Sequence, residues 1–158
     1  MPDMLVRLYA LPDARPGIEQ LASTGVTVRR PMAHEKAAVV DWVRETFSVA
    51  WSGECDVSFS NHPISCFVAV KEKAVIGFAC YDSTCKNFFG PTGVAEEHRS
   101  QGIGRVLLLA CLHAMAANGY GYAIIGGAGP TDFYTDVVGA IPIEGSTPGI
   151  YPNTPIDD

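Results

Sequence analysis

The chain has 158 residues, of which 47% are hydrophobic and 18% are charged, and its net charge at pH 7 is −6. This length fits one domain, and the hydrophobic content is too high for a disordered chain. An acidic chain without a basic patch is a poor partner for nucleic acid. No apolar run approaches the roughly 18 residues of a membrane span, and Asp3 and Arg7 interrupt any signal peptide. We therefore expect a cytoplasmic protein that binds neither membrane nor nucleic acid.

Five cysteines are spread along the chain, and no two of them are closer than five positions. Without a Cys-x-x-Cys pair, the sequence gives little support to a zinc site or a redox dithiol, and we expect no metal. Cys66, Cys80 and Cys111 lie within apolar runs, which predicts that they are small core residues.

The first elements form an N-terminal extension. Residues 4–11 are rich in β-forming side chains and predict a short strand, and residues 16–23 predict at most two helical turns. The alternation at residues 26–30 predicts the first strand of the main domain. We therefore expect an extension over residues 1–25 that packs on a domain spanning residues 26–158.

The middle of the chain predicts two helices and then three strands. Residues 34–47 carry apolar side chains at helical spacing, and a less regular helix is predicted over 51–59. The apolar runs 66–70 and 74–81 flank a short polar turn, which is typical of a hairpin. Residues 87–94 predict the next strand.

The last third begins with a helix over 104–118 that is apolar nearly all round, as expected for a helix buried against a sheet. A short strand at 122–125, a helix over 131–138 and an apolar stretch at 140–143 follow. The predicted order is strand, two helices, three strands, helix, strand, helix and strand, counted from residue 26.

A polar turn with two glycines joins the strand that ends at Val94 to the long helix. The first N–H groups of a helix lack internal partners and carry partial positive charge, so such an end binds phosphate when Gly102 and Gly104 leave room. The spacing excludes a P-loop, because no lysine follows either glycine. It also excludes a dinucleotide fingerprint, because Leu107 stands where the third glycine is required.

The remaining pattern, Arg99-Ser-Gln-Gly-Ile-Gly104, resembles the coenzyme A pyrophosphate loop of the GNAT superfamily of acyl-CoA-dependent N-acyltransferases. The order of elements over roughly residues 26–145 is similar to that of the same family. The resemblance implies an α/β (α+β) fold with a mixed, largely antiparallel central sheet flanked by helices, preceded here by the N-terminal extension.

The resemblance also implies a binding mode for acetyl-CoA. The backbone amides of the glycine turn would hold the pyrophosphate, two arginines would add charge, and strand backbone would bind the pantetheine arm. The implied contacts are Thr92, Val94, Arg99, Gln101, Gly102, Ile103, Gly104 and Arg105.

The catalytic residue implied by the resemblance is Tyr134, in a Phe-Tyr pair on the helix after the strand at 122–125. Its hydroxyl would protonate the leaving thiolate, a role that suits a phenol with a pKa near 10. Two features depart from the family pattern: Gly127 replaces a common asparagine, and Gly139 follows the tyrosine one residue later than usual. Trp51 and Glu54 would belong to the acceptor pocket. The general base is left open.

The implied function is direct transfer of an acetyl group from acetyl-CoA to an amine of a small molecule or peptide. Two alternatives remain: a non-catalytic CoA-binding regulatory module, and an unrelated nucleotide-binding enzyme. A homodimer is possible, in which the extension and an apolar tail would cover the interface between subunits. The apolar residues of the tail are Ile141, Ile143, Ile150 and Tyr151.

Overall fold

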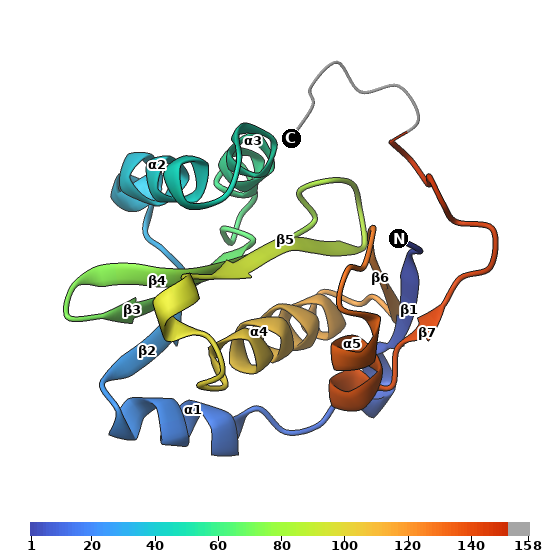
Figure 1. Cartoon of the computed structure of the whole chain (residues 1–158), viewed down its shortest axis with the longest axis horizontal. Helices are drawn as coiled ribbons and strands as arrows, with labels where there is room; N and C mark the ends of the chain where they lie inside the picture. Colours follow the sequence, from blue (N-terminus) through green and yellow to red (C-terminus); the bar gives the residue numbers. More distant parts are fainter. Residues whose placement is uncertain (152–158) are drawn as a thin grey trace.

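One mixed sheet of seven strands organises residues 1–151, the part of the chain that this computed structural model describes (Figure 1). The strand order is β2-β3-β4-β5-β6-β1-β7, and only β5 and β6 run parallel. This confirms the predicted mixed, largely antiparallel sheet. The last seven residues of the predicted domain 26–158 lie outside the described part. The strands are β1 Met4–Arg7, β2 Val26–Arg29, β3 Cys66–Lys71, β4 Ala74–Tyr81, β5 Phe88–Val94, β6 Tyr122–Ile125 and β7 Ile141–Pro142.

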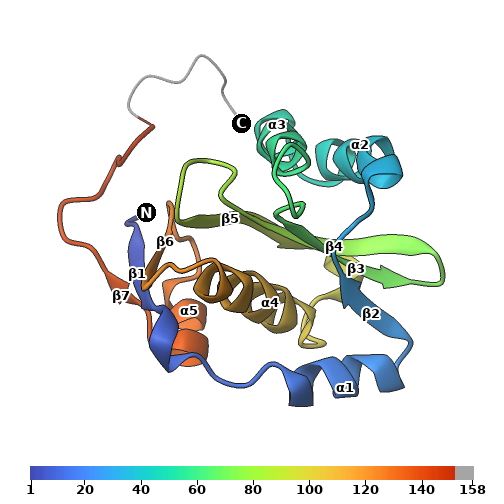
Figure 2. The ribbon, with the colours of Figure 1, turned by 180° about the vertical axis from the view of Figure 1, so that it is seen from behind.

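Helices cover both faces of the sheet. The helices α2 and α3 lie on one face, and α1 and α4 lie on the other, as the front and back views agree (Figures 1 and 2). Among residues 1–151, no helix is both long enough and apolar enough to cross a membrane. The helices are α1 Arg15–Ser23, α2 Lys36–Thr46, α3 Val49–Ser58, α4 Ile103–Ala117 and α5 Thr131–Val138, with 3-10 turns η1 Leu8–Ala10, η2 Ala33–Glu35 and η3 Glu96–His98.

The two layers enclose two hydrophobic clusters. The larger one packs α4 against the sheet together with residues of β1, β6 and α5, and it contains Cys111. The smaller one lies between the sheet and the helices α2 and α3, and it contains Cys66 and Cys80. All three cysteines have no exposed surface, which confirms that they are core residues, whereas Cys85 is exposed.

The N-terminal strand is shorter and more central than the sequence indicated. It ends at Arg7, and residues 8–10 form the 3-10 turn η1. β1 lies between β6 and β7 and pairs antiparallel with both. Met4 and Val6 are fully buried in the larger cluster. The domain boundary at residue 26 stays a prediction, but residues 4–7 are part of the sheet rather than a layer on its surface.

The entry into α2 is fixed by an ion pair between Arg29, at the end of β2, and Glu35. The guanidinium donates two hydrogen bonds of 2.7 and 2.8 Å to the carboxylate, which also accepts the Met32 N–H at 2.8 Å. These bonds lower the pKa of Glu35 from 4.5 to about 2, and the hydrogen bonds from Arg29 contribute most to this shift. A carboxyl group with a lowered pKa stabilises the fold above its unfolded pKa.

We expect Glu35→Gln to lower the free energy of unfolding at pH 7 by about 1 kcal/mol, because solvent screens this partly exposed pair. The deficit should shrink as the pH falls from 4.5 towards 2, where the wild-type carboxylate is also protonated. Urea unfolding at pH 7 and pH 3 measures both values. Glu45→Gln, which removes an exposed carboxylate in α2, serves as the control. A deficit that persists unchanged at pH 3 would contradict this account.

Candidate functional site

The chain between β5 and α4 passes twice through left-handed backbone conformations. Ser100 has φ +65° and Gly102 has φ +86°. Gly102 is the N-cap residue of α4. Glycine adopts this conformation without steric cost, whereas a side chain with a branched Cβ is strained there. Gly102 therefore sets the direction in which the first turn of α4 points.

The amide groups at this helix end have no internal partner. Gly102 offers no side chain to cap them, and the first intrahelical bond runs from Val106 N–H to the Gly102 carbonyl at 3.2 Å. Within residues 1–151, the backbone N–H groups from Gln101 to Arg105 donate no hydrogen bond. Consecutive free amides at the positive end of a helix form an anion-binding site.

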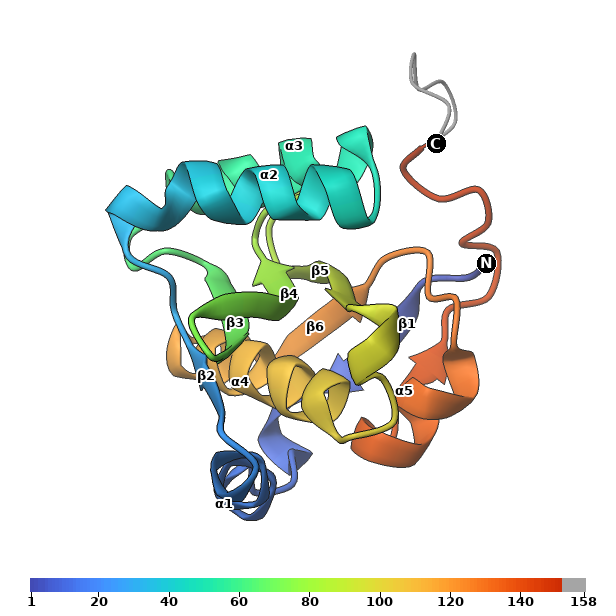
Figure 3. The ribbon, with the colours of Figure 1, turned by 60° about the vertical axis from the view of Figure 1, so that its left-hand side comes forward.

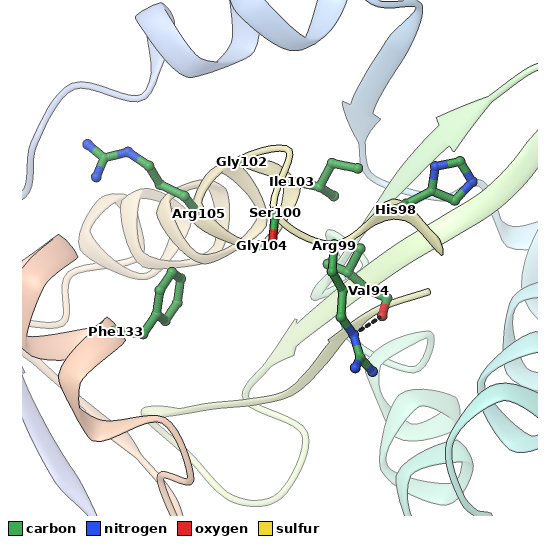
Figure 4. A pocket seen from close by; sticks show the side chains of 9 residues that line it. All are labelled: Val94, His98, Arg99, Ser100, Gly102, Ile103, Gly104, Arg105 and Phe133. Carbon is green, nitrogen blue, oxygen red and sulfur yellow. Dashed lines mark hydrogen bonds between the residues drawn. The ribbon is translucent and has the colours of Figure 1, made fainter. Parts of the chain in front are cut away.

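A cavity of about 370 Å³ lies against this turn (Figure 4). Its volume falls in the range of roughly 300–1,000 Å³ that small-molecule sites occupy. Six of the eight predicted cofactor contacts line it, whereas Thr92 and Gln101 do not. The lining residues are Val94, His98, Arg99, Ser100, Gly102, Ile103, Gly104, Arg105 and Phe133.

The strands β5 and β6 separate on the way to this cavity. They pair only at Phe88 and Phe89, opposite Ile124 and Ile125. On the side of β5 that faces β6, residues Gly90 to Val94 have no strand partner among the described residues. In Figure 3 the turn after β5 leads into the start of α4, and α5 faces it. The end of β5, at Val94, and the glycine turn therefore line the same cavity.

Two arginines carry positive charge beside the free amides. The Nε atom of Arg99 donates to the Val94 carbonyl at 3.2 Å, which ties the loop to the end of β5 (Figure 4). The other nitrogen atoms of the guanidinium bond no residue in the described part of the chain. Arg105 makes no hydrogen bond or ion pair with another residue of the described chain. A cation in the first turn of a helix opposes the helix dipole, and a bound anion would offset that cost.

We expect Arg105→Ala to shift two quantities in opposite directions. The free energy of unfolding without ligand should rise by about 0.3–1 kcal/mol, because an unfavourable charge is removed from the helix N-terminus. The affinity for CoA should fall roughly 2- to 5-fold, because the same charge favours a bound anion. Chemical unfolding and isothermal titration calorimetry measure the two effects. The control is Arg44→Ala in the last turn of α2, where a cation is favourable and its loss should only destabilise. A change of both quantities in the same direction would refute the assignment.

Three cavity residues were not among the predicted contacts: His98, Ser100 and Phe133. His98 ends the 3-10 turn η3, and its Nδ1 atom is buried and has no partner among the described residues. Its position just before Arg99 was a signal in the sequence for a place in the cavity. Phe133 comes from α5 and points towards the first turn of α4 (Figure 4). Only tertiary packing brings it there, so no local pattern could have found it.

Tyr134 lies beside the cavity rather than in its lining. Its ring packs edge-on against Phe89 of β5 and against Phe133, with centroids 6.4 and 5.2 Å apart. The side chain is 5% exposed, and its hydroxyl makes no hydrogen bond with another residue in 1–151. Burial raises the pKa of Tyr134 from 10.0 to about 12, so the phenol stays protonated at neutral pH.

The predicted acceptor residues lie apart from the cavity, on α3. Trp51 packs in an aromatic group with Phe47 and Phe78, at centroid distances of 5.3 and 6.1 Å. Glu54 accepts a hydrogen bond of 2.7 Å from the Thr84 hydroxyl. The structure therefore does not gather them with the glycine turn, and their role as an acceptor pocket stays a prediction.

Comparisons with solved structures give the fold a second line of evidence. The chain is similar to the GCN5-related glucosamine N-acetyltransferase region of a fungal multi-domain GH3 β-N-acetylglucosaminidase, with a TM-score of 0.73 and 14% identity, over 90% of this chain and 19% of that one. It is also similar to a GCN5-related N-acetyltransferase from Sphaerobacter thermophilus, with a TM-score of 0.65 and 20% identity, over 90% and 48%. A third, from Kribbella flavida, has a TM-score of 0.57 and 16% identity, over 89% and 53%.

The TM-scores show a shared fold, and at such low identities they show nothing beyond it. The chain spans about half or less of the length of these solved structures. No curated protein matches the sequence. The model of the Acetyltransferase (GNAT) family matches residues 36–132, which is more than half of the chain. The match begins at α2 and ends in α5, and it includes the splayed strands and the glycine turn. The chain therefore belongs to the GNAT family.

Proposed function

We propose that this chain is an N-acetyltransferase that moves an acetyl group from acetyl-CoA to an amine of a small molecule or peptide. The observation that carries the proposal is the row of unpaired amides from Gln101 to Arg105, which opens on a cavity between the glycine turn and α5. Such a site binds an anion. Because the chain belongs to the GNAT family, the anion that we propose is the pyrophosphate of coenzyme A.

In this proposal, the pyrophosphate of acetyl-CoA binds to the amides of the glycine turn, with Arg99 and Arg105 nearby. The pantetheine arm then lies along β5 on the side of β6, where Gly90 to Val94 have no strand partner among the described residues. Backbone groups at Thr92 and Val94 would bind its amides. This path brings the thioester towards Phe89, against which Tyr134 packs.

The chemistry is a direct acyl transfer. The neutral amine nitrogen attacks the thioester carbonyl, a new C–N bond forms, and the C–S bond breaks. The leaving thiolate takes a proton from the Tyr134 hydroxyl, and the amine releases its proton to solvent or to a base. Because burial keeps the phenol protonated, it is ready to donate to a thiolate. Holding both substrates together supplies much of the rate enhancement.

One feature favours a second function, that of a CoA-binding regulatory module without catalysis. Tyr134 is almost fully buried and does not line the cavity, so binding does not by itself bring its hydroxyl to the thioester. The two functions share the glycine turn and differ only in turnover.

The test combines ligand-dependent melting with a thiol-release assay. Acetyl-CoA and CoA should raise the melting temperature, whereas ATP and NAD should not. With acetyl-CoA present, release of free CoA should increase when amines from a broad panel of small molecules and peptides are added. Stabilisation by CoA without turnover on any amine would favour the binding module. Stabilisation by ATP or NAD alone would refute both.

A further inference from the structure

Three buried cysteines from three different elements meet in the smaller hydrophobic cluster. Cys66 of β3 and Cys80 of β4 are directly opposite each other in the sheet, and Cys55 reaches them from α3. Their three Sγ atoms lie within 4.8 Å of one another, and none of the three residues is exposed. Within residues 1–151 this is the only group of three or more histidine, cysteine or acidic side chains close enough to hold a metal ion.

The number of sulfur donors decides which ions suit this cluster. Structural zinc almost always takes four protein ligands in a tetrahedron, and iron–sulfur clusters also need four. No fourth ligand belongs to this group in the described chain. Asp56, the residue after Cys55, instead forms a half-exposed ion pair with Lys36 at 3.0 Å. Full burial keeps water from completing a tetrahedron.

Thiolate sulfur is a soft ligand that favours Cu(I), and three sulfur donors are enough to hold this ion. With a metal–sulfur bond of about 2.3 Å, a flat trigonal site places its sulfur atoms roughly 4 Å apart. The observed limit of 4.8 Å lies close to that value, so a small inward movement of the side chains is enough. The three cysteines bind as thiolates, so Cu(I) binding releases three thiol protons and leaves a net charge of −2 in this apolar region, a cost that the metal–sulfur bonds must offset.

We propose that Cys55, Cys66 and Cys80 form a three-sulfur site for a single Cu(I) ion. The ion would link α3 to the paired strands β3 and β4, and it would therefore stabilise the fold by preferential binding to the native state. Access requires local opening of α3, which supplies one ligand and covers the other two. The site is separate from the cavity at α4, so the proposal does not depend on the acetyltransferase function.

The experiment uses the reduced full chain under anaerobic conditions, with Cu(I) delivered from a chromophoric chelator. Native mass spectrometry should show one copper per chain, and chelator competition should give an affinity at least about 10-fold lower for Cys55→Ala and for Cys66→Ala. Cys85→Ala, which removes the exposed thiol, and Cys111→Ala, which removes a buried thiol elsewhere, should bind as the wild type does. Zn²⁺ under equal competition should not be retained.

Alanine variants of core cysteines can fail to fold, so circular dichroism is measured for each one, and a second readout uses only the wild type. X-ray absorption at the copper edge should show three sulfur neighbours, and copper should raise the melting temperature. The proposal is overturned if Cys55→Ala binds as tightly as the wild type, or if binding is lost in Cys85→Ala. A copper spectrum with nitrogen or oxygen ligands, or with two sulfurs, also overturns it.

Discussion

Gly102→Val should lower kcat/KM for acetyl-CoA by about 100-fold, because a displacement of about 1 Å at a binding site can cost that much. Gly102 has φ +86°, and a β-branched residue forced into this conformation would shift the first turn of α4. The amides from Gln101 to Arg105 would then no longer converge on one anion. The loss should appear mainly in KM and in the dissociation constant of CoA.

A matched control lies at the opposite end of the same helix. Gly119 has φ +99° and open space around it, so Gly119→Val imposes comparable backbone strain far from the cavity. Both variants should lose stability, and only Gly102→Val should lose affinity for CoA. Steady-state kinetics and calorimetry with both proteins separate the two effects. Equal affinities in the two variants would show that the glycine turn does not hold the cofactor.

Tyr134→Phe should lower kcat by about 10- to 10⁴-fold, the range for loss of a general acid, with little change in KM for acetyl-CoA. The hydroxyl makes no hydrogen bond within residues 1–151, so its removal should not weaken the fold. Tyr9→Phe, at an exposed tyrosine, is the control. An unchanged kcat would remove Tyr134 from the mechanism while leaving the CoA site intact.

The pH dependence gives a second check on Tyr134. Its folded pKa of about 12 lies above the ordinary value of 10.0. Because the pKa of Tyr134 is higher in the folded than in the unfolded chain, the stability linked to its protonated form is fully present below pH 10. That stability is lost as the pH rises towards 12. The wild type should therefore lose more stability than Tyr134→Phe over that interval, as measured by urea unfolding at pH 9, 10 and 11. Identical pH profiles would contradict the burial of the phenol.

Local patterns in the sequence predicted the elements with strong periodicity. The long helix at α4 is buried on nearly all sides, as its apolar residues indicated, and the glycine turn falls where its spacing placed it. The family model confirms the GNAT resemblance. Sheet order was harder to predict, because strand pairing depends on residues far apart in the chain.

At the site too, residues from one continuous segment could be predicted, whereas residues brought together by tertiary packing could not. The residues proposed as cofactor contacts between Val94 and Arg105 come from one continuous segment, and most of them line the cavity, while their contact with a cofactor stays a prediction. Phe133 was not predicted as a contact, because its place depends on how α5 packs. The meeting of Cys55, Cys66 and Cys80 was also missed, because spacing rules detect ligands on one segment and these lie on three.

The strand β1 is synthesised early but can join the sheet only late. Residues 4–7 are synthesised long before their strand partners, residues 122–125 and 141–142. Contacts between such distant positions form late and slow down folding. A nascent chain must therefore keep Met4 and Val6 unpaired until residues 122–125 and 141–142 have been synthesised, so this segment is where early misassociation would begin.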